Sequence, residues 1–336
     1  MANFLDALNT VIWSPVLVFL CLGAGIYFTV VTRGLQVRCI PDMLKQLREG
    51  ESSEAGISSF QSLMISLAGR VGVGNIAGVA VALTLGGPGA IFWMWVVATV
   101  GMATAYVESA LAQLYKRRDA AGHYRGGPAF YMAHGLRKPW LGAIFSVCLI
   151  LAFGLVFSAV QANSISEAVT GAWGVAPGWT ALVLVAIAAP VIFGGLRRVA
   201  ATAELVVPAM ALAYLLLAAW VIVTNLAEVP AMLALIVRSA FGLDQAAGGV
   251  LGGLAVALLN GVKRGLFSNE AGMGSAPNIA AAATPVPHHP ASQGLVQSLG
   301  VFIDTLLSCS ATGFVILLSG VLGSEGDGVL LTQRAV

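Results

Sequence analysis

The sequence contains very few charged residues. Asp, Glu, Lys and Arg make up only 10% of its 336 residues, whereas a soluble globular domain has about 25%. Hydrophobic residues make up 58%, and the mean hydropathy is +0.89. Such a composition excludes an ordinary soluble domain, which needs polar side chains all over its surface. We therefore expect an integral membrane protein surrounded by lipid bilayer. The net charge of +2 is too small to indicate a nucleic-acid partner.

Cysteine and histidine are also scarce, with four of each. The cysteines form no CxxC pair and have no histidine at ligand spacing, which argues against a disulfide framework and a zinc site. Motifs for catalysis are lacking as well, because no HExxH, GxSxG or close carboxylate pair occurs. The absence of a P-loop excludes primary active transport by this chain. We expect no cofactor and no enzymatic activity.

Long apolar runs dominate the chain instead. A transmembrane helix needs roughly 20 apolar residues, and by this criterion the chain divides into about eight segments. They lie near residues 11–32, 57–84, 88–115, 139–168, 178–195, 202–225, 249–284 and 294–320. The N-terminus lacks the basic region and cleavage site of a secretory signal, so the first segment is expected to remain as a helix.

Basic residues indicate how these segments are oriented. Alternate connectors carry nearly all of them, whereas the intervening connectors, including a loop over 226–248, carry only Arg238. The basic connectors hold Arg33, Arg38, Lys45, Arg48, Lys116, Arg117, Arg118, Arg125, Arg137, Lys138, Arg197 and Arg198. Because cytoplasmic loops are enriched in Lys and Arg, the N-terminus is expected outside, in a multi-pass protein of the cell (inner) membrane.

The second segment contains an interruption, LAGRVGVGN at residues 67–75. A helix break at mid-depth is tolerated only where it faces protein or a water-filled cavity, because backbone groups in lipid need partners. Carbonyls freed at the break suit a small cation, and the amides that open the next half-helix suit a carboxylate. Glycine spacing alone also fits close helix packing. The charge of Arg70 favours a functional cavity or an ion pair.

A second interruption, VKRGLFSNEAGMGSAPN at residues 262–278, lies in the seventh segment. It likewise combines glycine, asparagine and charges with an apolar run. Broken helices in matching positions of two halves indicate the binding site of an inverted-repeat transporter. The two broken segments are about five segments apart, which fits inverted five-helix repeats that begin at the second segment. The first segment is then an extra helix.

Several long stretches carry a family resemblance. The chain resembles the alanine or glycine:cation symporter family in GVGNIAGVA (72–80), GGPGAIFWMWVVATVG (86–101), YRGGPAFYM (124–132), FSNEAGMGSAPN (267–278) and FIDTLLSC (302–309). The resemblance covers essentially the whole chain. It implies an all-α, leucine-transporter-type fold of two inverted repeats. It also implies inward symport of small neutral amino acids, alanine or glycine, with sodium or in some members protons.

The resemblance implies a single transmembrane domain over residues 1–336. The extra helix covers 11–32, the first repeat 57–225 and a partial second repeat 249–320. The second repeat lacks the helix that ordinarily supplies hydroxyl ligands to one sodium site. We therefore expect a fragment truncated at its C-terminus rather than a degenerate family member. Proton coupling remains an alternative, as does a transporter-like nutrient sensor, which typically carries a soluble signalling domain.

The resemblance also places candidate ligands on both breaks. Sodium is expected to bind at Gly69, Arg70, Val71, Asn75 and Asp304. The amino acid is expected to bind at Gly72, Val73, Gly74, Gln161, Phe267, Ser268, Asn269, Gly272 and Met273. The first set would act through backbone carbonyls and the Asn75 oxygen, and the second through backbone amides and pocket side chains.

Some of these side chains have a second interpretation. Phe267 and Met273 either limit the size of the substrate or face lipid. Asn269 either binds the substrate ammonium or caps its half-helix. Gln161 either contacts substrate or forms a hydrogen bond between helices.

The intramembrane carboxylates are also ambiguous. Asp304 either supports the cation site or pairs with a buried base such as Arg70 or Arg264. Glu108 and Glu204 lie nearer the cytoplasmic ends of their helices and are expected to be structural.

Overall fold

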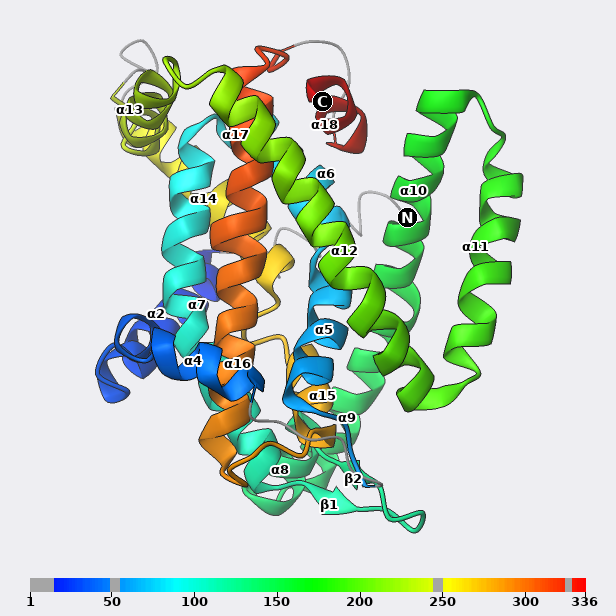
Figure 1. Cartoon of the computed structure of the whole chain (residues 1–336). Helices are drawn as coiled ribbons and strands as arrows, with labels where there is room; N and C mark the ends of the chain where they lie inside the picture. The colour runs from blue at the N-terminus through cyan, green and yellow to red at the C-terminus, as the bar shows by residue number, and fades with distance from the viewer. Residues whose placement is uncertain (1–14, 49–54, 244–249, 324–327) are drawn as a thin grey trace.

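The computed structural model describes residues 15–48, 55–243, 250–323 and 328–336. These residues are mainly helical (Figure 1). The first part contains α2 (Pro15–Val31), α3 (Leu35–Arg38), α4 (Ile40–Arg48), α5 (Ser59–Arg70), α6 (Val73–Gly86), α7 (Gly89–Leu114), β1 (Arg117–Arg118), β2 (Tyr124–Arg125) and α8 (Pro128–His134). The middle contains α9 (Pro139–Leu149), the π-helical η1 (Ile150–Phe157), α10 (Ser158–Trp173), α11 (Pro177–Ile192), α12 (Gly195–Thr224) and α13 (Val229–Ala240). The last part contains α14 (Val250–Asn269), α15 (Ser275–Ala282), α16 (Pro290–Val301), the π-helical η2 (Phe302–Cys309), α17 (Ser310–Leu318) and α18 (Gly328–Ala335).

Several of these helices have the length and apolar character needed to cross a membrane. Four continuous stretches do so by themselves: Gly89–Leu114, Pro139–Trp173, Gly195–Thr224 and Pro290–Leu318. In addition, α5 and α6 together form a span that is bent by 40° at a short break. Each predicted segment contains helix, although residues 11–14 of the first lie outside the described residues.

The connector over 226–248 is not simply a loop, as the sequence had suggested. It contains α13, which buries Met232, Ile236 and Ala240 against the core. These residues recur every four positions and so form one face of a helix. Four-residue spacing in so short a segment is easily missed beside longer apolar runs. Residues 244–248 of this connector lie outside the described part of the chain.

Helix α7 forms the centre of the molecule, where it packs against α14, α16, α2 and α15. Figure 1 shows α7 and α16 side by side. Small residues bring α14 close to α7: a Cβ at Gly261 would collide with the Ala90 carbonyl, and one at Gly265 with Val97. Close helix approach through small residues is typical of membrane proteins, since dispersion contacts replace the hydrophobic effect in lipid.

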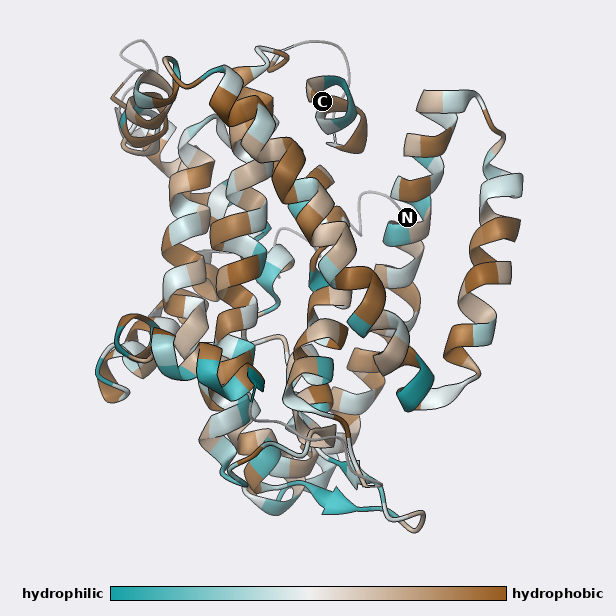
Figure 2. Ribbon diagram, viewed as in Figure 1, coloured by the Kyte–Doolittle hydropathy of each residue, from teal (hydrophilic) through white to brown (hydrophobic). Residues whose placement is uncertain are grey.

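The helix pair α10 and α11 stands at one side of the molecule, and hydrophobic residues recur along α11 (Figure 2). The most hydrophobic part of the stretch Pro139–Trp173 has no buried residues. On α11, Leu182, Val185 and Ile187 are all exposed. Such exposed apolar surface is suited to lipid rather than to water.

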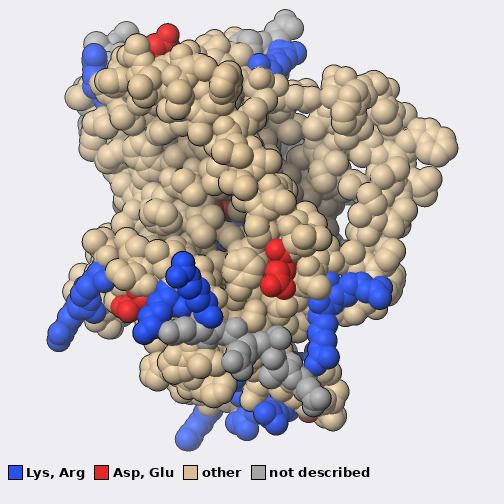
Figure 3. Space-filling view, viewed as in Figure 1, with Lys and Arg blue, Asp and Glu red and all other residues tan. Residues whose placement is uncertain are grey.

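Charged side chains are concentrated towards one end. Figure 3 shows most Lys and Arg gathered at the lower end, around α4, the β1–β2 hairpin and the start of α12. In the hairpin, Arg125 Nε donates to Asp119 Oδ2 at 2.6 Å, and this hydrogen bond lowers the pKa of the Asp119 carboxyl. The α10–α11 turn lies at the opposite end in Figure 1.

Candidate functional site

The first broken helix ends and restarts within two residues. The Val71 amide closes α5 on the Leu67 carbonyl at 2.7 Å, and the Ile76 amide opens α6 on the Gly72 carbonyl at 3.1 Å. Val71 and Gly72 both have extended backbones. The Asn75 side chain caps α6, because its Oδ1 accepts the Gly72 amide at 3.2 Å.

Glycines at this break allow two other helices to approach closely. A Cβ at Gly72 would lie 2.9 Å from Gln161 Oε1, and one at Gly74 would lie 3.0 Å from Ser268 Cα. The break therefore contacts both α10, which carries Gln161, and α14, which carries Ser268. Gln161 Oε1 accepts the Val73 amide at 3.3 Å, so in this structure Gln161 links two helices at the proposed substrate position.

The second broken helix unwinds between α14 and α15. Glu270, Gly272 and Gly274 all have positive φ, at 54°, 86° and 79°. A left-handed glutamate is unusual and marks a constrained turn. Glu108 Oε1 accepts the Gly272 amide at 3.2 Å, so this carboxylate on α7 supports the break.

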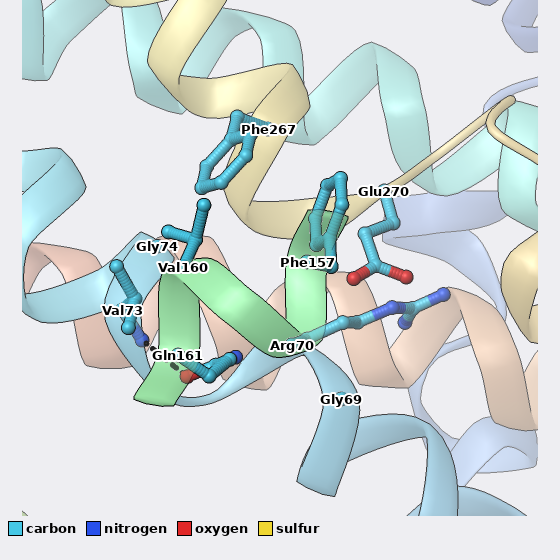
Figure 4. A pocket seen from close by; sticks show the side chains of 9 residues that line it. All are labelled: Gly69, Arg70, Val73, Gly74, Phe157, Val160, Gln161, Phe267 and Glu270. Carbon is cyan, nitrogen blue, oxygen red and sulfur yellow. Dashed lines mark hydrogen bonds between the residues drawn. The ribbon is translucent and has the colours of Figure 1, made fainter. Parts of the chain in front are cut away.

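A small cavity lies where the two breaks meet (Figure 4), and we call it the closed cavity because its free space is too small for an amino acid. Its lining consists of Gly69, Arg70, Val73, Gly74, Phe157, Val160, Gln161, Phe267 and Glu270. The Phe157 and Phe267 rings stack with their centroids 4.9 Å apart and their planes at 25°. The remaining space is about 10 Å³, which accommodates about one water molecule.

Some predicted substrate residues lie away from this cavity. Asn269, Gly272 and Met273 are not in its lining. Asn269 Oδ1 instead accepts the Ala271 amide at 3.0 Å, in the turn after its own helix. Gly272 borders a separate space beside α2 and α7. The sharp turn at Glu270 directs Gly272 and Met273 away from the cavity, and the position of this turn is not evident from the spacing of residues in the motif.

A buried polar cluster lies next to the first break. Asp304 in η2 is completely buried, and its Oδ1 and backbone carbonyl both accept Asn75 Nδ2, at 2.8 and 2.9 Å. Its Oδ2 accepts Ser268 Oγ at 3.0 Å and Thr305 Oγ1 at 2.7 Å. Cys309 Sγ lies 3.1 Å from Ser268 Oγ. Ser268 thus contacts Asp304, the carboxylate that also accepts Asn75, and it does not line the closed cavity.

This cluster is assembled from three elements, α6, α14 and η2. The π-helical turn widens the helix at Asp304, and such turns frequently occur at functional sites. Oxygen atoms dominate the cluster, and hard oxygen ligands suit a small hard cation. Gly69, Arg70 and Val71 lie at the end of α5, one turn of chain before Asn75.

Arg70 is buried at the same break, with an exposed fraction of only 2%. None of its Nε, Nη1 and Nη2 atoms has a hydrogen-bond partner in the described part of the chain. Its charge interacts electrostatically with the carboxylates of Glu108, Glu270 and Asp304. Among the described residues, Asp304 forms no ion pair within 4.0 Å with Arg70 or Arg264.

The sequence analysis missed three residues of the cavity: Phe157, Val160 and Glu270. Phe157 precedes Gln161 by four residues and therefore lies on the same helical face. That spacing was a usable signal once Gln161 had been chosen. Glu270 lies inside the quoted motif of the second break, between Asn269 and Gly272.

Two larger cavities follow the closed cavity in the direction of the basic end, and each shares lining residues with the one before. A second cavity of about 550 Å³ shares Gly69, Phe157, Gln161 and Glu270 with the first. A third, of about 620 Å³, shares two residues of α15 with the second and reaches the β1–β2 hairpin and the start of α12.

Apolar spans around a central cavity at two broken helices define a multi-pass membrane transporter. The chain belongs to the sodium:alanine symporter family, whose model matches residues 1–336. The members of this family are transporters, not enzymes.

Named relatives have similar sequences over nearly the whole chain. A probable sodium/glutamine symporter, GlnT of Bacillus subtilis, is 50% identical over 98% of this chain and 68% of its own length. The amino-acid carrier protein AlsT of the same species is 48% identical over 100% of this chain and 71% of its own. The sodium/alanine symporter AgcS of Methanococcus maripaludis is 40% identical over 96% of this chain and 72% of its own.

Proposed function

We propose that this protein is a secondary active symporter that imports a small neutral amino acid, alanine or glycine, together with sodium. The observation that carries the proposal is the closed cavity between two broken helices, directly beside the buried Asp304 cluster. The names of the relatives support sodium-coupled amino-acid transport.

The substrate carboxylate binds at the start of α6 in this proposal. The Val73 amide points at Gln161 Oε1, which occupies the position of a carboxylate oxygen. The positive end of the α6 dipole favours an anion there. Binding then requires Gln161 to release this amide, while Phe157 and Phe267 close around a short side chain.

Sodium binds beside the Asp304 carboxylate in this proposal. Ser268 Oγ, Thr305 Oγ1 and Asn75 supply further polar groups, and the carbonyls that end α5 lie nearby. Asn75 contacts both sites, because its oxygen accepts the Gly72 amide and its nitrogen donates to Asp304. This side chain is therefore suited to couple the two ligands, each of which orders the same break.

We also propose the orientation and fold type that the resemblance implies. Helices α5–α12 correspond to one repeat and α14–α17 to part of an inverted second one, in the leucine-transporter arrangement. The basic end faces the cytoplasm, and the N-terminus lies outside. The route of larger cavities then opens towards the cytoplasm, so the structure represents an inward-facing form of the carrier.

Glutamine is a second candidate substrate. A relative named as a probable sodium/glutamine symporter is 50% identical to this chain. The adjoining cavity of about 550 Å³ also offers room for a longer side chain.

Uptake into proteoliposomes tests the proposal. Vesicles that contain the purified protein are given labelled alanine, glycine or glutamine with an inward sodium gradient, an inward proton gradient or neither. We expect alanine or glycine to accumulate only with the sodium gradient. Accumulation of glutamine alone would select the second candidate. Accumulation driven by a proton gradient without sodium would show that the coupling ion is the proton. If none of the three amino acids is taken up, the proposal is overturned.

A further inference from the structure

The side chain of Arg70 has an unusual environment for a buried cation. An arginine stays charged at all physiological pH values and presents five N–H donors. Here the guanidinium is 2% exposed and lines the closed cavity, yet none of its nitrogens has a hydrogen-bond partner among the described residues. A charge held in this way is costly unless a partner arrives in another state of the protein.

The position of the guanidinium identifies that partner. A Cβ at Gly300 would lie 2.7 Å from Arg70 Nη1, so the guanidinium rests against α16 in the space that a side chain would fill. Gly300 and Asp304 are four residues apart, which places them on one face of the continuous helix formed by α16 and η2. The guanidinium thus lies about one helical turn from the Asp304 carboxylate.

Three carboxylates surround this single base. Glu108, Glu270 and Asp304 all interact electrostatically with Arg70. Figure 4 shows the Arg70 side chain directed away from Gln161 and towards the Glu270 carboxylate. Among the described residues, the hydrogen-bond donors to the Asp304 side chain are neutral groups on Asn75, Ser268 and Thr305. When the cation site is empty, the buried Asp304 carboxylate therefore needs a positive charge from elsewhere.

We propose that Arg70 supplies this charge: its guanidinium moves to Asp304 when sodium leaves, and returning sodium displaces it towards Glu270. The inference rests on the proposed sodium site at Asp304. After both ligands have left, the empty symporter has to return from its inward-facing to its outward-facing form. An internal cation that replaces sodium at this stage lets the empty carrier return without an uncompensated buried charge. Arg70 also competes with sodium for Asp304, and so weakens sodium binding.

Two transport modes separate this role from a structural one. Exchange of labelled for unlabelled amino acid, with sodium on both sides, never needs the empty carrier. Net uptake into empty vesicles needs it in every cycle. We therefore compare exchange, net uptake and the sodium concentration for half-maximal binding in wild type, Arg70→Met and Arg70→Lys, using whichever amino acid the wild type transports.

For Arg70→Met we expect net uptake to fall at least tenfold more than exchange does, and half-maximal binding at a several-fold lower sodium concentration. Arg70→Lys retains a charge and is expected to recover part of the net uptake. Equal losses of exchange and net uptake in Arg70→Met, or a higher sodium requirement, would overturn the inference. Binding that ignores sodium in the wild type would instead overturn the proposed function, so the two failures are distinguishable.

A second variant tests the same idea with Arg70 in place. Gly300→Ala removes the space that holds the guanidinium against α16. It is expected to change the sodium concentration for half-maximal binding at least threefold. Gly252→Ala is the matched control, because a Cβ at Gly252 on α14 meets no atom within 4 Å. An unchanged sodium requirement in Gly300→Ala would show that this position of Arg70 does not influence the cation site, and would contradict the inference.

Discussion

At the scale of single residues, Asn75 is the side chain that joins the two parts of the site. Its oxygen accepts the Gly72 amide at 3.2 Å, and its nitrogen donates to Asp304 Oδ1 at 2.8 Å. A change at Asn75 therefore acts on both the restart of α6 and the carboxylate proposed to bind sodium. The effect of such a change on sodium binding and its effect on substrate affinity can be measured separately.

Asn75→Ala is expected to raise the sodium concentration for half-maximal alanine binding about fivefold, because the loss of one hydrogen bond costs about 1 kcal/mol. Alanine affinity at saturating sodium is expected to recover substantially. The measurement is alanine binding across a sodium series at fixed pH. A sodium dependence equal to that of wild type would remove Asn75 from the cation site.

Phe267→Ala is expected to weaken alanine binding and to admit glutamine, because the Phe267 ring lines the closed cavity and its removal enlarges the space. Each extra methylene that the enlarged cavity buries contributes about 0.8 kcal/mol, or about fourfold in affinity. Competition of unlabelled glutamine with labelled alanine measures the change. Met273→Ala is the control, because Met273 lies outside the cavity lining and selectivity is expected to stay as in wild type. An unchanged selectivity in Phe267→Ala would mean that the ring does not face the substrate.

At the scale of elements, the close packing of α14 on α7 determines where the second break lies. Gly261 and Gly265 face α7 without side chains, and the chain unwinds one turn after Gly265. The carboxylate of Glu108, also on α7, then accepts the Gly272 amide. The same helix therefore supports both the intact and the broken part of this segment.

Gly265→Val is expected to lower the thermal unfolding midpoint of the detergent-purified protein. The new side chain would collide with Val97, and overpacking of this kind costs about 1–3 kcal/mol. Gly252→Val on the same helix is the control, because a Cβ there meets no atom within 4 Å. Equal midpoints for the two variants would contradict the close α7–α14 contact.

At the scale of the whole molecule, the basic residues and the larger cavities lie towards the same end. Lys and Arg gather at the end that carries the β1–β2 hairpin (Figure 3), and the wider cavities lead to the same end. If that end is cytoplasmic, the described form is the one that releases substrate inward. The orientation of the protein in the membrane therefore determines the side to which this form releases substrate, and that orientation can be tested.

Cysteine labelling tests this orientation in intact cells. On a background without the four native cysteines, Arg118→Cys in the hairpin is expected to react only with membrane-permeant reagents. Gly178→Cys, at the exposed start of α11, is expected to react with impermeant reagents. The opposite pattern would invert the topology, and the larger cavities would then open outward.

Much of the architecture followed from the sequence because lipid imposes simple constraints. Apolar runs predicted where helices form, and four continuous stretches and one bent pair among the described residues have the length and apolar character of a span. Glycine with charge inside two of the runs predicted both breaks. The helix α13 was missed because its one buried face is short. Asn269, Gly272 and Met273 were predicted to bind the substrate, but they lie outside the lining of the cavity, and the left-handed turn at Glu270 separates Gly272 and Met273 from α14.

The sequence by itself determined that this chain is a helical membrane protein of a recognisable transporter family, since composition, hydrophobic length and local motifs depend only on neighbouring residues. The tertiary structure decided which side chains meet. Asp304 meets both Ser268 and Asn75, while Phe157 meets Phe267 and Arg70 rests against Gly300. These contacts join helices that are distant in the chain, and they depend on packing distances and turn geometry that residue spacing within a single helix does not specify.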